Sequence, residues 1–226
     1  MLIDLKRACV IELLPERTQA AVIASLQQQG PAFCQAIEVF SCDMWDGFVN
    51  SATAVLPNAT IVIDRFHVMR QLHEAIDKAR RALRHMQPDQ DVLKRLRWLF
   101  LKHPEELTPD EQPRLEQAFQ AFPEVEQLWQ LKEDFRRWYD TFDCPDQADW
   151  WLSQWIDQAK ALGNRYLDTF VKTLQRWRTS ILNFFVHRIT NGLVEGINNI
   201  IKAINRRAFG FVNFDHFRLR VLLECR

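Results

Sequence analysis

The spacing of apolar residues changes abruptly after Ile63, and this change constrains the fold more than any other feature of the sequence. Before it, β-type runs alternate with helical stretches, and Ala59–Ile63 is a continuous β-favouring run that is apolar apart from Thr60. Such strands, alternating with helices, are typical of buried parallel pairing. From Phe66 to about His187 the apolar spacing is helical. The sequence therefore predicts an α/β fold that is interrupted by a large all-helical insertion.

The segment before the insertion contains signals for individual elements. Thr18 is placed to cap a helix, and Gly30-Pro31 is placed to end it. The predicted elements are a β-hairpin, a helix, a strand, a second helix and a second strand, over residues 2–14, 18–29, 36–42, 44–56 and 59–63. We expect three segments: a partial sheet domain over 1–70, the helical insertion over 71–187, and a return to the first domain over 188–226.

Composition excludes some classes of protein. The 226 residues carry a formal net charge of zero, so a chain that binds nucleic acid must concentrate its cations locally. No apolar run reaches the length of a membrane span, and we expect no membrane partner. Five widely separated cysteines without metal-site spacing indicate reduced thiols in a cytoplasmic protein. Most tryptophans lie in the helical segment, where they pack in a core or stack on bases.

The stretch from Thr190 to Arg207 predicts an amphipathic helix. Its apolar residues share one face: Leu193, Val194, Ile197, Ile200, Ile201 and Ile204. The opposite face carries Glu195, Asn198, Asn199, Lys202 and Arg206. A carboxylate followed by cations suits a site that contacts phosphate oxygens. An ordinary surface helix with ion pairs has the same spacing.

Asp43 directly follows a predicted strand. In open α/β sheets, sites form at the carboxyl ends of strands. A carboxylate there, together with one from a helix packed across the edge, offers the oxygen ligands that Mg²⁺ prefers. Alternatively, an Asp at this position caps the helix that follows.

Two blocks of sequence resemble the ISL3 family of bacterial DDE transposases. The C-terminal block reads T-N-G-x-x-E-G-x-N-x-x-I-K-x-I-x-R-x-A-x-G-F over residues 190–211 and continues through Phe214, Phe217 and Arg218. The upstream block contains Asp43-Met44, Pro57-Asn58-Ala59 and Ile63–Val68. Both blocks are in family order, and the resemblance covers essentially the whole chain. It implies a partial ribonuclease H-like core, with a mixed sheet and flanking helices.

The resemblance also implies roles for individual residues. Asp43 matches the second catalytic aspartate and Glu195 the terminal glutamate, so both are expected to bind Mg²⁺ or Mn²⁺, with two ions in the complete enzyme. Asp64-Arg65-Phe66-His67 resembles an Asp-x-x-His signature, which places His67 beside the scissile phosphate. A core histidine bonded to backbone is the alternative for His67. The expected DNA-binding residues are Asn198, Lys202, Arg206 and Arg207.

The chain departs from the family at its beginning. The first catalytic aspartate of the family lies on a strand upstream of the segment that Leu2–Leu5 matches, and Asp4 aligns with a non-catalytic Asp. We therefore expect a chain that begins inside the second strand and lacks the family's zinc-binding and helix-turn-helix regions. Such a truncated product, or part of a longer one, is expected to be inactive alone.

Three functions follow from these features. The first is a transposase segment that cleaves DNA at element ends and joins it to target DNA, as a homo-oligomer, with Asp43, His67 and Glu195 converging. The second is an inactive remnant that binds DNA or full-length transposase as an inhibitor. The third is a helical interaction domain unrelated to DNA, against which the cations argue: Lys202, Arg206, Arg207, Arg218 and Arg220.

Overall fold

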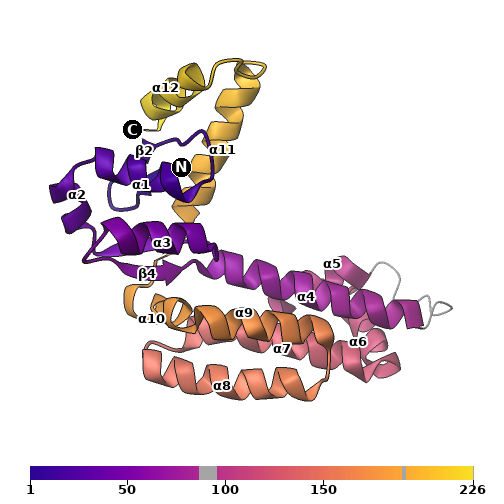
Figure 1. Ribbon diagram of the computed structural model, residues 1–226. Helices are drawn as coiled ribbons and strands as arrows, with labels where there is room; N and C mark the ends of the chain where they lie inside the picture. The colour runs from indigo at the N-terminus through magenta and orange to yellow at the C-terminus, as the bar shows by residue number, and fades with distance from the viewer. Residues whose placement is uncertain (87–95, 190–191, 226) are drawn as a thin grey trace. The chain divides into compact units, whose positions relative to one another are not determined.

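The chain divides into two compact units. The computed structural model describes residues 1–86, 96–189 and 192–225. Unit 1 comprises Met1–Asp64 and His187–Arg226, and unit 2 comprises Arg65–Val186 (Figure 1). The fold is mixed α/β, with more helix than sheet. None of the described helices is both long and apolar enough to cross a membrane.

Unit 1 contains all the described strands of the chain. Its elements are β1 (Leu2–Asp4), β2 (Cys9–Glu12), α1 (Gln19–Gln28), α2 (Pro31–Ala36), β3 (Val39–Cys42), α3 (Asp46–Val55), β4 (Thr60–Ile63), α11 (Gly192–Arg207) and α12 (Phe214–Glu224). The strands form two separate pairs, an antiparallel β1-β2 hairpin and a parallel β3-β4 pair. The hairpin and the parallel pairing confirm the sequence predictions.

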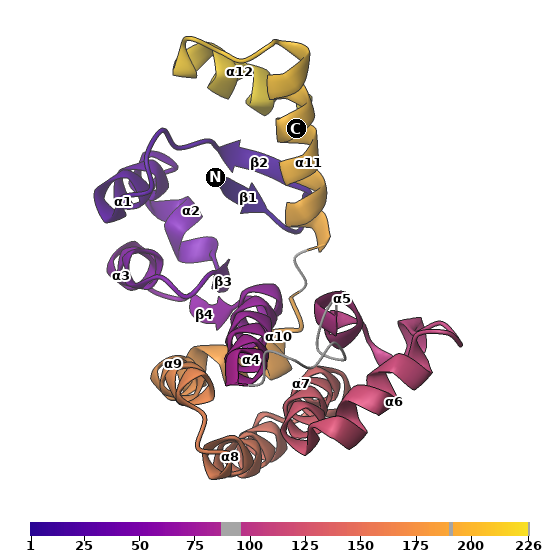
Figure 2. The same cartoon turned by 90° about the vertical axis from the view of Figure 1, so that its right-hand side faces the viewer.

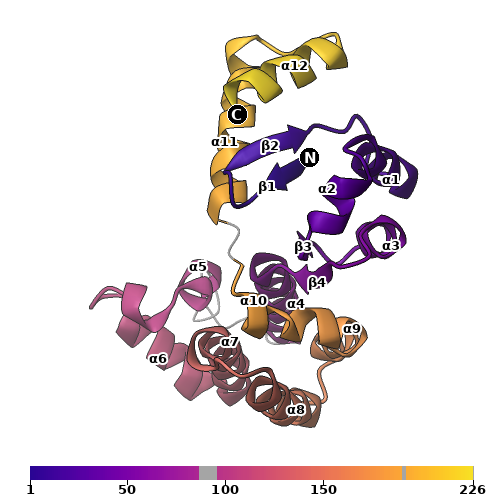
Figure 3. The ribbon, with the colours of Figure 1, turned by 90° about the vertical axis from the view of Figure 1, so that its left-hand side faces the viewer.

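The hairpin is a layer between two groups of helices (Figures 2 and 3). Successive strand residues point to opposite faces. Val10 therefore packs with Ile197 of α11 and Val221 of α12, while Leu2 packs with Val22 of α1 and Ala52 of α3. Burying an aliphatic side chain of this size stabilises the folded state by about 1.5–3 kcal/mol relative to leaving it exposed. The C-terminal helices thus complete a core that the first strands begin.

One helix of unit 1 was not predicted. Gly30-Pro31 was expected only to end α1, but Pro31 is the first residue of α2. Proline is favourable there because its fixed φ suits a helix. It also loses no hydrogen bond, because a backbone N–H in the first turn would have no acceptor within the helix. The strand predicted from Ala36 therefore begins only at Val39.

Unit 2 is a helical assembly. Its elements are α4 (Arg65–Met86), α5 (Leu96–Leu101), the 3-10 helix Pro104–Glu106, α6 (Gln112–Ala121), α7 (Pro123–Thr141), α8 (Pro145–Ala161), α9 (Arg165–Leu182) and most of α10 (Phe184–His187). Figure 1 shows α4, α7, α8 and α9 running alongside one another, and each packs on two of the others. No strand occurs in the described residues of this unit, as the apolar spacing predicted.

Aromatic side chains form the centre of unit 2. The ring of Phe135 lies 5.1 Å from Trp138, 4.8 Å from Trp155 and 5.7 Å from Phe170 between centroids. Trp138 and Trp155 are buried, and each indole N–H donates to a backbone carbonyl. Core packing therefore accounts for these two tryptophans, whereas Trp98 is 70% exposed.

Candidate active site

Two aspartates lie at the same edge of the parallel strand pair. Cys42 of β3 is in register with Ile63 of β4, so the residues that follow, Asp43 and Asp64, leave the pair together. The Asp64 N–H donates to the Cys42 carbonyl at 3.0 Å, and Asp64 is 3% exposed. Burial, and then the charges of both aspartates, raise the pKa of the Cys42 thiol to about 12. Strand register thus brings two carboxylates around one thiol.

The two oxygens of Asp43 have different surroundings. Oδ2 accepts a hydrogen bond from Arg17 Nη2 at 2.7 Å. The Arg17 guanidinium also lies 5.0 Å from the centre of the Trp45 ring and 5.3 Å from that of Phe48. Oδ1 is buried and accepts no hydrogen bond within the described structure. A buried carboxylate oxygen without a donor is costly, and a divalent cation is the kind of ligand that satisfies it.

Asp43 and Asp64 therefore fit part of a magnesium site. Mg²⁺ is usually held by one or two carboxylates and completes its shell with water and phosphate oxygens. Among the described residues, however, no three His, Cys, Asp or Glu side chains are grouped to hold a metal. The structure brings Asp43 together with Asp64, and it does not gather Glu195 with them into a three-ligand site.

Glu195 lies in the first turn of α11, where its side chain is exposed. Two residues of the predicted apolar face point into the core, because Ile197 and Ile204 are buried against the hairpin. Ile200 is 44% exposed, so the apolar face is narrower than the spacing indicated. A carboxylate near a helix N-terminus is favoured by the helix dipole, which gives Glu195 a structural role even without a metal.

His67 belongs to unit 2 rather than unit 1. It is in the first turn of α4, half-buried, and its ring meets that of Phe66 edge to face with centroids 5.4 Å apart. The expected convergence of His67 with Asp43 and Glu195 remains a prediction.

The C-terminal cations fall into two groups. Arg207 pairs with Glu224, Arg220 pairs with the same carboxylate at 2.5 Å, and Arg218 pairs with the buried Glu12. Lys202 and Arg206 are exposed and make no ion pair with any described side chain, and Asn198 is exposed beside them. The sequence treated all five cations alike, but three of them form ion pairs within unit 1. The side-chain bond from Arg218 holds the pKa of Glu12 below its usual value.

Sequence reasoning missed Arg17 and underestimated Asp64. Arg17 lies in a loop 26 positions from Asp43, and no periodicity connects the two. Asp64 was expected as part of a motif rather than as a first-choice metal ligand, although the expected parallel pairing placed it beside Asp43.

Comparison with known proteins identifies the family. The model of the ISL3-type DDE family, described as "Transposase", matches residues 1–221. The chain is 31% identical over 218 residues to the transposase for insertion sequence element IS1001 of Bordetella parapertussis. The alignment covers 94% of this chain and 53% of that protein. It is 25% identical over 196 residues to the transposase for IS1557 of Mycobacterium tuberculosis, covering 76% and 44% respectively.

These relatives are longer than the chain, which spans about half the length of each. No solved structure matches. The family match nevertheless extends over nearly the entire chain, from the hairpin through the Glu195 helix to α12. The chain belongs to the ISL3 family of DDE transposases.

Proposed function

We propose that this chain is the C-terminal catalytic segment of a transposase that cleaves DNA at the ends of a bacterial insertion sequence and joins them to target DNA. The observation that carries the proposal is the Asp43–Asp64 edge, where a buried oxygen of Asp43 accepts no hydrogen bond from any residue that the structure describes. Family membership supplies the reaction class. We further propose that the segment acts in the cytoplasm and as a homo-oligomer with DNA.

The proposed core is ribonuclease H-like and built from residues 1–70 and 188–226, with 71–187 as a helical insertion. In support, β1 and β3 each pair on one side only among the described strands. One further strand between them would join the two pairs into a single sheet and remove two unpaired edges. In a ribonuclease H-like core that strand carries the first catalytic aspartate.

In this proposal Asp43 and Glu195 bind the metal ions, which are Mg²⁺ or Mn²⁺. DDE transposases use divalent metal ions, and bound ions supply an activated attacking oxygen and stabilise the leaving oxygen. Asp43 offers its unpartnered Oδ1 directly, and Oδ2 becomes available when Arg17 releases it. Asp64 adds negative charge at the same edge, and His67 positions the scissile phosphate.

Lys202 and Arg206 are proposed to hold the DNA backbone, with Asn198 beside them. Both cations are exposed and follow Glu195 along α11. Because such contacts are made to phosphates, they position the DNA without reading its sequence. Arg207 joins this contact when DNA displaces its pairing with Glu224.

Metal-dependent strand cleavage tests this function. The assay compares the chain alone with a version that is extended upstream by a strand bearing an Asp, using labelled element-end DNA and Mg²⁺ or Mn²⁺. We expect no cleavage by the chain alone and cleavage by the extended version. Glu195→Gln and Asp43→Asn should abolish cleavage, because each removes a negatively charged metal ligand.

The matched control is Asp157→Asn, which removes an exposed carboxylate on α8 of unit 2. It should leave cleavage unchanged. If Glu195→Gln in the extended protein cleaves as well as the parent, Glu195 is not a ligand and the proposal fails.

The second candidate is an inhibitor of transposition. It is favoured by Lys202 and Arg206, which are exposed, make no ion pair with any described side chain and so offer positive charge to DNA without a metal ion. Adding the chain to an active ISL3-type transposase should then lower strand transfer, and this should require Lys202 and Arg206 if the two compete for DNA.

A further inference from the structure

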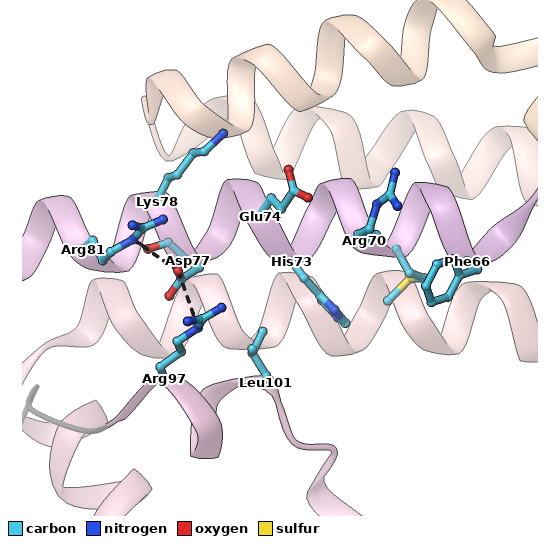
Figure 4. Close-up of a pocket in the computed structure, with 10 residues that line it drawn as sticks. Phe66, Arg70, His73, Glu74, Asp77, Lys78, Arg81, Arg97 and Leu101 are labelled. Atoms are coloured by element: carbon cyan, nitrogen blue, oxygen red, sulfur yellow. Dashed lines mark hydrogen bonds and ion pairs between the residues drawn. The ribbon is translucent and has the colours of Figure 1, made fainter. Parts of the chain in front are cut away.

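A groove of about 550 Å³ runs along α4 and α5 of unit 2 (Figure 4). Apolar side chains line part of it, including Phe66, Met69 and Leu101. Its charged residues are four cations, Arg70, Lys78, Arg81 and Arg97, and two acids, Glu74 and Asp77. Burial and the nearby Lys132 charge lower the pKa of His73, which also lines the groove, to about 4. The positive charge of the groove near neutral pH therefore comes from arginine and lysine.

Asp77 is a buried carboxylate that is shared by three arginines. Arg80, itself buried, donates to it at 2.7 Å from Nη2 and 3.2 Å from Nε. Arg81 Nε lies 3.2 Å and Arg97 Nε 3.9 Å from the other Asp77 oxygen. Figure 4 shows Arg81 and Arg97 reaching this carboxylate from two different helices. One negative charge is thus outnumbered by three positive charges, and the excess lies at the surface.

The two outer arginines keep their terminal groups available. Arg81 and Arg97 are 56% and 57% exposed, and each meets Asp77 through Nε. Their Nη groups make no hydrogen bond to any described residue. A guanidinium held at Nε presents a planar pair of N–H donors, which matches the oxygens of a phosphate.

Further contacts hold both arginines in place, and for Arg81 this is a hydrogen bond from Nε to the Asp77 backbone carbonyl at 3.4 Å. The Arg97 guanidinium lies 5.3 Å from the centre of the exposed Trp98 ring. The helix that carries Arg97 is anchored at its C-terminal end, because the buried Lys132 donates to the carbonyls of Phe100 at 2.9 Å and Lys102 at 2.7 Å. Fixing a side chain before binding reduces the entropy that a ligand must overcome.

From these contacts we infer that Arg81 and Arg97 bind a backbone phosphate of DNA in the groove, and that Asp77 orients both arginines for this contact. The inference rests on the proposed function, which makes DNA the partner. It adds a contact surface in the helical unit that is separate in sequence from Asp43, Glu195 and the α11 cations. Asp77 is a positioning residue, because it acts through the arginines.

Binding of a labelled DNA duplex of arbitrary sequence to the intact chain, followed by fluorescence anisotropy over a series of salt concentrations, tests the contact. Arg81→Gln and Arg97→Gln should each weaken binding roughly tenfold, the effect of losing a charge-assisted hydrogen bond. The slope of log affinity against log salt should fall by about 1 when the phosphate contact is lost. Arg114→Gln, an exposed arginine of α6 outside the groove, is the control for net charge and should have little effect.

Asp77→Asn gives a test in which the effect of net charge and the effect of arginine orientation change DNA affinity in opposite directions. The variant makes the chain more positive by one charge, so DNA affinity rises if only net charge matters. If Asp77 orients Arg81 and Arg97, affinity falls instead. Because Asn leaves the buried Arg80 without its anion, circular dichroism and thermal melting must show that unit 2 is folded, and the two surface arginine variants decide the matter if it is not.

The outcomes separate this inference from the proposed function. If Lys202→Gln and Arg206→Gln weaken binding while the Arg81 and Arg97 variants bind as the parent does, the groove inference is wrong and the function stands. An equal loss in Arg114→Gln, or a gain in a folded Asp77→Asn, also contradicts it. If the parent chain does not bind DNA, both fail. Loss in the groove variants with Arg114→Gln unaffected supports the inference.

Discussion

Arg17 occupies one oxygen of the carboxylate that is expected to bind metal. Its guanidinium donates to Asp43 Oδ2 and rests against Trp45 and Phe48, so a cation that uses both oxygens of Asp43 must displace it. Arg17 is 59% exposed, and an ion pair of this exposure contributes only about 0.2–1 kcal/mol. The guanidinium is therefore a counter-charge that is easily exchanged.

Arg17→Ala should increase the affinity of the chain for Mn²⁺ about three- to tenfold, because the competing ion pair and ring contact are lost. Isothermal titration calorimetry measures this affinity. Arg7→Ala is the matched control, since Arg7 is an exposed arginine of the same unit that pairs with Asp4. Unchanged or weaker Mn²⁺ binding in Arg17→Ala would show that Arg17 does not compete at Asp43.

His73 should make the stability of the chain depend on pH. Burial first, and then the charges of Lys132 and His103, lower its pKa from 6.5 to about 4. Well above pH 6.5 His73 is neutral in both the folded and the unfolded chain. As the pH falls from 6.5 towards 4, only the unfolded chain binds the proton, so the free energy of unfolding decreases, by at most about 3 kcal/mol.

In His73→Leu the free energy of unfolding should decrease less between pH 6.5 and pH 4 than in the parent. Urea denaturation across the same pH range measures it. His85→Leu replaces an exposed histidine of the same helix and should keep the pH dependence of the parent. A parent and a His73→Leu variant with parallel pH profiles would mean that His73 titrates normally.

At the residue level, the sequence identified what each candidate is but not what it contacts. Asp43 and Asp64 could be placed at one edge because strand ends and parallel pairing are visible in the pattern of apolar residues. Arg207 was expected to be available to DNA, but it pairs with Glu224 on α12. That pairing depends on the angle of the turn between two helices, which apolar spacing does not reveal.

The end of α11 has an unusual residue at a demanding position. Gly210 N donates to the Asn205 carbonyl at 2.9 Å and Phe209 N to the Arg206 carbonyl at 3.1 Å, which is the Schellman arrangement. Phe209 has a φ of 53°, in the left-handed region where glycine is usual. Its side chain is fully exposed, so packing does not offset the strain.

Phe209→Gly should therefore stabilise unit 1 by about 0.5–1 kcal/mol, because removing the Cβ relieves the left-handed backbone. Thermal or urea unfolding of the full chain measures the gain. Val212→Gly provides the contrast: Val212 is equally exposed but has no positive φ, so glycine should add only flexibility there. A loss of stability in Phe209→Gly would show that the Phe209 ring packs in solution.

At the element level, the sequence predicted a helix boundary correctly where a single capping residue determines it. Thr18 caps α1 as predicted, its hydroxyl accepting from the Ala21 N–H at 3.2 Å. Pro31 misled, since proline both terminates one helix and begins the next. The predicted strand over 36–42 was also too long, because its first residue, Ala36, is as compatible with the end of a helix as with a strand.

At the scale of the whole molecule, unit 2 lies in chain order between the two segments of unit 1. The change of periodicity near residue 65 predicted the helical character of the segment that follows, because long helices repeat their apolar residues many times. The layers of unit 1 were less visible. Val10 packs with Ile197 and Val221, and no local pattern relates positions so far apart.

The interrupted course of unit 1 has a consequence for the order in which it is made. After Asp64 leaves the ribosome, about 120 residues of unit 2 follow before α11 and α12 can cover the hairpin. At ~5–20 residues per second, that interval is on the order of ten seconds. Unit 2 is continuous and can fold within it, while the face of the hairpin around Ile3 and Val10 still lacks its cover. The nascent chain thus exposes an apolar strand surface throughout that interval, and such a surface favours aggregation until the C-terminal helices have been made.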